Sequence, residues 1–162
     1  MAQSVSAPAK IILLGEHAVV YGKPSLAVPM STLRAYAQTI PMPRNSGLKI
    51  IAVDLDQQQF VVDLSSTKLD QPLVTAALLL LNDLGSPFPD AKIILHSDIP
   101  IASGMGSGAA ITTALFRAIM LLLNKSLPND RLNNLVYEVE KIHHGTPSGV
   151  DNTVIEIGRA HV

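Results

Sequence analysis

The stretch SGMGSGAAITTALF, from Ser103 to Phe116, places three alternating glycines directly before a strongly apolar run. Glycine loses more backbone entropy on folding than any other residue, so glycines gather where the chain must turn sharply or approach another group closely. The apolar residues that follow recur at helical spacing, with Ile111, Leu115 and Ile119 on one stripe. The stretch therefore predicts a glycine-rich turn that opens a helix at residues 109–124.

The start of such a helix is suited to an anion. Its first backbone N–H groups lack intrahelical acceptors, and the helix dipole adds partial positive charge at the same end. Glycine at positions 104, 106 and 108 removes side chains that would hold an anion away. The turn therefore predicts a phosphate-binding loop, with a tight turn for close helix packing as the alternative. The pattern matches neither the Rossmann GxGxxG fingerprint nor the GxxxxGK[ST] loop, so a bound nucleotide implies another fold.

The overall composition is that of a single folded domain. Of 162 residues, 48% are hydrophobic and 15% are charged, which favours a globular chain with a substantial core. The formal net charge of −1 argues against nucleic acid as a main partner, and the absence of cysteine excludes disulfides and thiolate metal sites. No apolar run approaches the roughly 20 residues needed to cross a bilayer, and no secretory signal begins the sequence. We therefore expect a cytoplasmic protein that does not bind a membrane.

The order of predicted elements indicates the fold class. Short apolar or alternating runs bounded by Pro, Gly and Asn predict strands, and apolar residues three or four apart predict helices. The predicted strands are residues 11–14, 31–40, 48–53, 59–64, 91–97 and 152–157, and the predicted helices are residues 72–84, 109–124 and 130–143. This order favours an α+β domain in which helices pack on one face of a mixed sheet.

A second segment, KIILLGEHAVVYG from Lys10 to Gly22, ends a predicted strand in polar residues. Glu16 and His17 are adjacent at the end of that strand, where they can bind a polar substrate. An exposed loop without a role is the more common origin of such a pair. Lys10, at the beginning of the strand, leaves the same two interpretations open.

The third segment, EKIHHGTPSGVDN, brings Asp151 to the point where a loop with Gly and Pro meets the last predicted strand. Carboxylates at the ends of elements are well placed for general-base chemistry, or for magnesium, which prefers oxygen ligands. A capped turn with solvated charge is the alternative, and for a single Asp it is the more frequent one.

Together the three segments resemble those of the mevalonate kinases, within the GHMP kinase superfamily. KIILLGEHAVVYG is similar to the family pattern KVILFGEHAVVYG, PIASGMGSGAA (residues 100–110) to PxGxGLGSSAA, and HGTPSGVDN (residues 144–152) to HGxPSGxDN. GEHAVVYG favours mevalonate kinase over galactokinase, whose equivalent usually reads GEHTD. The resemblance covers residues 7–157. It implies a GHMP kinase N-terminal domain, with a ribosomal-protein domain-2-like βαβ fold, at residues 1–157, and an atypical tail at residues 158–162.

The resemblance implies ATP-dependent phosphorylation of the alcohol of mevalonate in isoprenoid precursor synthesis, with Mg²⁺ as cofactor. By position it makes Asp151 the catalytic base and Lys10 the cation beside the substrate hydroxyl. Ser107 and Glu140 would hold the Mg²⁺. The residues implied to bind ATP are Pro100, Ser103, Gly104, Met105, Gly106, Ser107, Gly108, Ala109 and Ala110. Those implied to bind the substrate are Glu16, His17 and Ser148.

The sequence departs from the family pattern at three points. Ser107–Gly108 stands where the family has two serines, and Ala102 stands where it has a glycine. A C-terminal motif resembling KxTGAGGGG does not occur in the sequence. This implies that the C-terminal GHMP domain is absent and that the 162-residue chain alone has little kinase activity. Two alternatives stay open, a GHMP kinase acting on a sugar or an amino alcohol, and a nucleotide-binding fragment without turnover. A homodimer also stays open.

Overall fold

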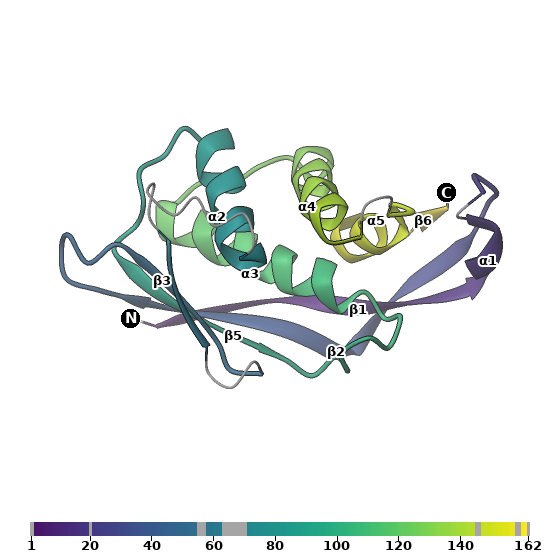
Figure 1. Cartoon of the computed structure of the whole chain (residues 1–162), viewed down its shortest axis with the longest axis horizontal. Coiled ribbons are helices and arrows are strands. Elements are labelled where there is room, and N and C mark those ends of the chain that lie inside the picture. The colour runs from purple at the N-terminus through teal and green to yellow at the C-terminus, as the bar shows by residue number, and fades with distance from the viewer. Residues whose placement is uncertain are drawn as a thin grey trace.

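The computed structural model describes residues 2–19, 21–54, 58–62, 71–144, 147–157 and 160–161. In this part of the chain a mixed sheet carries helices on one face, which confirms the predicted α+β fold (Figure 1). None of the helices described there combines the length and the apolar character that a membrane crossing requires.

The described strands form one sheet in the order β1-β2-β5-β3-β4, with β6 paired to β2. Their bounds are β1 (Gln3–Leu14), β2 (Leu26–Pro41), β3 (Leu48–Ala52), β4 (Gln58–Val62), β5 (Ala91–Ser97) and β6 (Ala160–His161). Strands β3 and β5 are parallel, and the other described pairs are antiparallel. The helices are α1 (Glu16–Val19), α2 (Pro72–Asp83), α3 (Ser107–Leu123), α4 (Asn129–His144) and α5 (Val150–Ile157).

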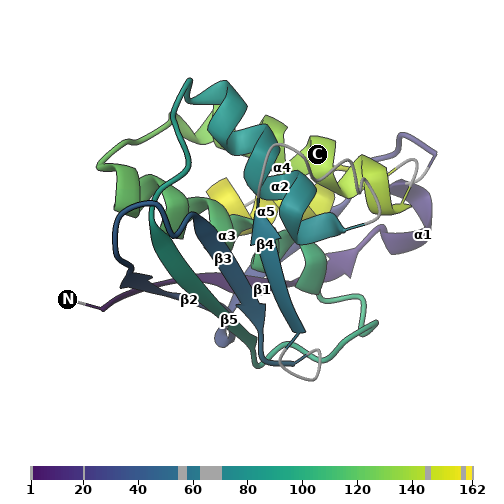
Figure 2. The same cartoon turned by 60° about the vertical axis from the view of Figure 1, so that its left-hand side comes forward.

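Helix α3 is the centre of the core. It contacts β1, β2 and β5 on one side and α2, α4 and α5 on the others, so that it lies between the sheet and the remaining helices (Figures 1 and 2). This position explains the long apolar run, because residues on almost every side of α3 are buried, including Leu115, Phe116 and Ile119. The helix begins at Ser107, two residues before the predicted start.

Small side chains bring α3 close to the sheet. Ala7 and Ala9 of β1 and Ala35 and Ala37 of β2 are fully buried. Helix α3 contributes further buried alanines at positions 109, 110, 114 and 118. Alanine carries little strand preference, so the alternation in the first half of β1 is weak in sequence. For this reason β1 is predicted only from residue 11, although it begins at Gln3.

The prediction of a last strand at residues 152–157 is wrong, because these residues belong to helix α5. Val150, Val154 and Ile155 are buried, and their spacing places them on one side of a helix. Asp151 lies in the first turn, where the partial positive charge of a helix start favours a carboxylate. The run TVIEI is too short for its periodicity to separate helix from strand.

The start of β2 also differs from the prediction. Strand β2 begins at Leu26 rather than at residue 31, and it continues through Pro29, which pairs with Lys10. The predicted strand at residues 59–64 corresponds to β4, and residues 63–64 lie outside the described part. Two residues of the predicted tail form β6, which pairs with the start of β2.

Candidate functional site

Lys10 and Asp151 form an ion pair across the interface of β1 and α5. The Nζ atom of Lys10 lies 2.8 Å from Oδ1 of Asp151. The Lys10 side chain is 4% exposed, whereas that of Asp151 is 32% exposed. A buried ammonium therefore holds a carboxylate that remains accessible to a ligand from solvent.

The glycine-rich loop lies against this ion pair. The backbone N–H of Lys10 donates a hydrogen bond to the carbonyl oxygen of Met105 at 3.0 Å. Gly106, with φ 71, is the residue before α3. A Cβ atom on Gly106 would lie 3.1 Å from Cδ1 of Ile155, 3.2 Å from Cγ of Lys10 and 3.5 Å from Cβ of Asp151. Glycine at this position thus brings the start of α3 against the ion pair, and the three sequence segments meet there.

The first turn of α3 offers backbone donors at its open end. The N–H of Ala110 donates to the carbonyl oxygen of Gly106 at 2.9 Å, which is the first bond of the helix. The N–H groups of Ser107, Gly108 and Ala109 precede it and have no intrahelical acceptor. The side chains of Ala109 and Ala110 are fully buried, so a ligand can meet these alanines only at the backbone.

The rest of the loop is shaped by local contacts. The hydroxyl of Ser103 donates to the carbonyl oxygen of Pro100 at 2.7 Å and closes the turn. Ala102 has φ 57, a left-handed backbone that favours glycine. The family pattern has a glycine at this position, and the methyl group of Ala102 therefore stands on a strained backbone. Gly104 shares the left-handed conformation, with φ 73.

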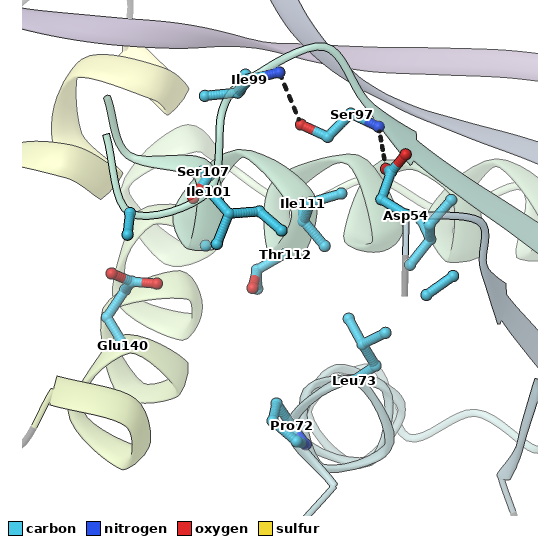
Figure 3. Close-up of a pocket in the computed structure, with 14 residues that line it drawn as sticks. Asp54, Pro72, Leu73, Ser97, Ile99, Ile101, Ser107, Ile111, Thr112 and Glu140 are labelled. Carbon is cyan, nitrogen blue, oxygen red and sulfur yellow. Dashed lines mark hydrogen bonds between the residues drawn. The ribbon is translucent and has the colours of Figure 1, made fainter. Parts of the chain in front are cut away.

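Glu140 of α4 faces the start of α3. A Cβ atom on Gly108 would lie 3.0 Å from Oε1 of Glu140, and Glu140 is only 4% exposed. Figure 3 shows its carboxylate pointing from α4 toward the loop and Ser107. A serine at position 108, as in the family pattern, would place its Cβ against this carboxylate. The structure therefore brings Ser107 and Glu140 to one pocket, as the metal prediction requires.

That pocket has a volume of about 630 Å³ and is larger than a second pocket beside it. Its size lies within the roughly 300–1,000 Å³ typical of small-molecule sites. Pro72 and Leu73 of α2 lie across from Ile111 and Thr112 of α3, with Glu140 toward one end and Asp54 toward the other (Figure 3). The remaining lining residues are Ala52, Leu95, Ser97, Ile99, Ile101, Ala102, Ser107 and Gly108. Sequence reasoning missed most of this wall, since it is assembled from separate segments without a local motif.

A smaller pocket of about 180 Å³ adjoins the larger one at Glu140, which lines both. It also contains Ser148 and Asp151, which the resemblance assigns to substrate binding and catalysis. The hydroxyl of Ser148 accepts a hydrogen bond from the N–H of Val150 at 3.4 Å. The other lining residues are Pro147, Gly149 and Asn152. Glu16 and His17, which were predicted to bind the substrate, are exposed on α1 and line neither pocket.

His96 fixes Asp54 at the far end of the larger pocket. Its Nδ1 lies 2.9 Å from Oδ1 of Asp54 and its Nε2 lies 3.2 Å from Oδ1 of Asp98. The hydrogen bond to Asp54 raises the pKa of His96 above its ordinary value of 6.5, because both ring nitrogens donate only when the ring is protonated. The N–H of Ser97 also donates to Asp54, at 2.6 Å. This cluster stabilises the fold fully below pH 6.5, and the contribution is lost as the pH rises through the raised pKa.

Replacing Asp54 by asparagine is expected to return the pKa of His96 toward 6.5, because the main hydrogen bond to the charged ring is weakened. An NMR titration of the ring protons measures this directly. Asp98→Asn is the matched control and should lower the pKa less, since Asp98 is the weaker contributor. An unchanged pKa in Asp54→Asn would contradict the assignment of Asp54 as the main cause.

Known proteins resemble this chain in sequence. The family described as GHMP kinases N terminal domain matches residues 72–158. A mevalonate kinase of Thermococcus sibiricus is 34% identical, over 94% of this chain and 49% of the relative. One of Pyrococcus abyssi is 33% identical, over 94% of this chain and 48% of the relative. The chain thus spans about half the length of the curated relatives that it matches.

Solved structures share the fold. The crystal structure of the Methanococcus jannaschii mevalonate kinase superposes with a TM-score of 0.87 at 28% identity, covering 98% of this chain and 52% of that one. Lactococcus lactis galactokinase complexed with galactose gives a TM-score of 0.79 at 20% identity, covering 96% of this chain and 42% of that one, and so supports the fold alone. Because the family match covers more than half of the chain and the fold agrees, the chain belongs to the GHMP kinase family and carries its N-terminal domain.

Proposed function

We propose that this chain carries the site at which a kinase transfers phosphate from ATP to the alcohol of mevalonate. The observation that carries the proposal is the position of Gly106, which brings the start of α3 against the ion pair of Lys10 and Asp151. An anion-binding helix start and a carboxylate able to take a proton are thereby adjacent. The relatives named mevalonate kinases, and the segment GEHAVVYG, favour mevalonate over a sugar as the acceptor.

In this proposal Asp151 and Lys10 act on the substrate hydroxyl. Lys10 binds one oxygen of the Asp151 carboxylate, and the other oxygen accepts the proton of the hydroxyl as it attacks. The ammonium of Lys10 stabilises the negative charge that develops on the attacking oxygen. Ser148 and Asp151 line the smaller pocket, which we assign to mevalonate.

The nucleotide is assigned to the larger pocket. Its phosphates would lie on the N–H groups at the start of α3, where the helix dipole favours negative charge. Its base and ribose would extend between α2 and α3, along apolar side chains such as Leu73 and Ile111. Since the two pockets adjoin at Glu140, the terminal phosphate and the substrate hydroxyl would meet beside Asp151. Phosphate transfer depends mainly on such positioning and on charge neutralisation.

Ser107 and Glu140 fit a magnesium ion. A hydroxyl and a carboxylate are oxygen ligands of the kind that Mg²⁺ prefers, and Gly108 leaves room between them. Among the described residues there is no group of three or more His, Asp or Glu side chains that could hold a metal ion. The other ligands would therefore be phosphate oxygens and water. When bound, Mg²⁺ supplies positive charge that offsets the charge of the nucleotide phosphates.

Ser107→Ala is expected to weaken binding of Mg-ATP about tenfold, because one hydroxyl ligand is lost while the fold is unchanged. Calorimetric titration of the chain measures the affinity, and metal-free ATP should bind the variant and the parent alike. Thr112→Val, which removes another hydroxyl of the same pocket, is the control and should leave the metal dependence unchanged. Unchanged Mg-ATP affinity in Ser107→Ala would overturn the metal assignment.

The transfer itself is tested by incubating mevalonate and Mg-ATP with the chain. The same assay is run with the chain fused to the part of the Thermococcus sibiricus relative that it does not cover. Phosphomevalonate, detected by ³¹P NMR, is the expected product. Phosphorylation of galactose or homoserine in preference to mevalonate would overturn the substrate, and failure of the chain to bind ATP would overturn the nucleotide site.

A further inference from the structure

A half-buried arginine joins the same two elements that carry Lys10 and Asp151. Arg117 lies in the third turn of α3. Its Nη1 donates to the carbonyl oxygen of Ser6 in β1 at 2.8 Å, and its Nη2 donates to Oε2 of Glu156 in α5 at 3.3 Å. The Glu156 side chain is only 1% exposed. Arg117 therefore links β1 to α5 from the helical layer.

This second link is displaced from the ion pair along both elements. Ser6 precedes Lys10 by four residues of strand, about 13 Å, and Glu156 follows Asp151 by five residues of helix, about 7.5 Å. Helix α3 serves both links, because Gly106 at its start touches the ion pair and Arg117 makes the other contact. Two separated links fix the direction of α5 relative to β1, which a single link cannot do.

Ser6 is itself anchored from the neighbouring strand. Its hydroxyl accepts a hydrogen bond from Nε of Arg34 in β2 at 2.9 Å. The Arg117 link therefore ends on a residue that is held by the sheet. By contrast, the apolar contacts of α5, through Val150, Val154 and Ile155, are non-directional, and the hydrogen bond that Asn152 donates to Asn133 reaches α4 rather than β1.

The ion pair of Arg117 and Glu156 requires that a carboxylate be removed from water, which opposes folding. Burial raises the pKa of the Glu156 carboxyl above its usual range, and the charge of Arg117 opposes this effect. Apolar residues of similar volume often stabilise a fold as well as or better than a buried ion pair. Stability alone therefore does not account for an arginine and a glutamate at this place.

We propose that Arg117 and Glu156 are positioning residues, which hold α5 at the angle that brings Asp151 to Lys10. Their meaning for catalysis rests on the proposed function. The geometric coupling between the two links is independent of ATP, of mevalonate and of turnover.

The test replaces both charges together by apolar groups, in the double variant Arg117→Met, Glu156→Leu. We expect the melting temperature to stay the same or to rise, as for other buried ion pairs replaced in this way. The contact between Lys10 and Asp151 should nevertheless loosen. The ε-CH₂ resonance of Lys10, observed by NMR in the intact chain, reports on this contact, and Asp151→Asn supplies the position of the signal when the pair is lost.

The expected result is a shift of the Lys10 signal by at least half of the way to its position in Asp151→Asn. Lys125→Met is the matched control, because Lys125 also binds a backbone carbonyl and a side chain, those of Leu84 and Ser86, but away from the site. It should leave the Lys10 signal in place. An unmoved Lys10 signal in the folded double variant overturns the proposal.

Arg117→Lys keeps the inference testable if the double variant does not fold. A single ammonium has one nitrogen and cannot span both acceptors as the guanidinium does, so a smaller shift of the same sign is expected. No shift would again overturn the coupling. In phosphate-transfer assays of the double variant, kcat should fall about 10- to 100-fold with little change in the KM for ATP. A moved Lys10 signal in a chain that phosphorylates no alcohol would refute the proposed function but not the coupling.

Discussion

Asp151→Asn is expected to leave ATP and mevalonate bound but to lower the rate of phosphate transfer about 10²–10⁴-fold, the usual contribution of a general base. The amide preserves the shape of the side chain in the smaller pocket. It cannot accept the proton of the hydroxyl, and it carries no charge to pair with Lys10. A coupled assay of kcat, with calorimetry for both ligands, separates loss of chemistry from loss of binding.

Lys10→Met should reduce turnover to a similar extent, because it removes the buried cation, 4% exposed, that pairs with Asp151 and that we propose to stabilise the attacking hydroxyl. The double variant should lose less than the product of the two single losses, since both groups act on one proton transfer. Glu138→Gln is a suitable control, because Glu138 pairs with Lys141 on the surface of α4. A transfer rate in Asp151→Asn above one tenth of the parent rate would contradict the role of Asp151.

Gly15→Ala is expected to destabilise the fold more than the same substitution at a glycine that has open space around it. Gly15 has φ 85, and an added Cβ would lie 2.6 Å from the carbonyl oxygen of Pro24 and 2.9 Å from Cα of Ser25. Both contacts are with backbone, so the chain itself must move. Strain and overlap together should lower the free energy of unfolding by about 2–4 kcal/mol. The melting temperature, measured by circular dichroism, should fall by about 5–15 °C.

Gly22→Ala separates the effect of backbone strain from the effect of steric overlap. Gly22 has φ 69 but open space around its Cβ position, so only backbone strain is added. We expect a loss of about 1–2 kcal/mol. Equal losses in the two variants would show that the overlap at Gly15 is relieved without cost. A large loss at Gly15 would show that the close approach of residues 24–25 holds the end of β1 in place.

Local signals explain which parts of the fold could be predicted. The glycine-rich turn and helix α3 are predictable within a few residues, because glycine placement and a long apolar run act over neighbouring positions. Helix α5 reads as a strand, since the run TVIEI is too short for its periodicity to separate a helix from a strand. The first half of β1 escapes prediction because its buried residues are alanines that face another alanine-rich surface.

The residues of the candidate site also divide into those that the sequence could predict and those that it could not. A resemblance points to Asp151, Lys10 and the loop, and the structure brings all three together. The contact between Lys10 and Asp151, which lie near opposite ends of the chain, has no signal in composition or spacing. The wall of the larger pocket and the pair Arg117–Glu156 could not be predicted, because each joins segments that carry no motif of their own. The acidic residue within the apolar run TVIEI is a signal that could have indicated a buried partner.

The hydrogen bond from Lys10 to Met105 has a consequence for solubility. Strand β1 is the terminal strand in the described sheet order, and exposed edge strands are templates for pairing with other chains. The carbonyl oxygen of Met105 in the loop accepts a hydrogen bond from the N–H of Lys10, so one donor of that strand edge is already paired. A substitution that displaces the loop would therefore uncover strand edge as well as impair the site. Each loop variant is therefore expected both to lose activity and to aggregate. Insoluble material in expression trials and a lower rate in the kinase assay would then report on the same contact.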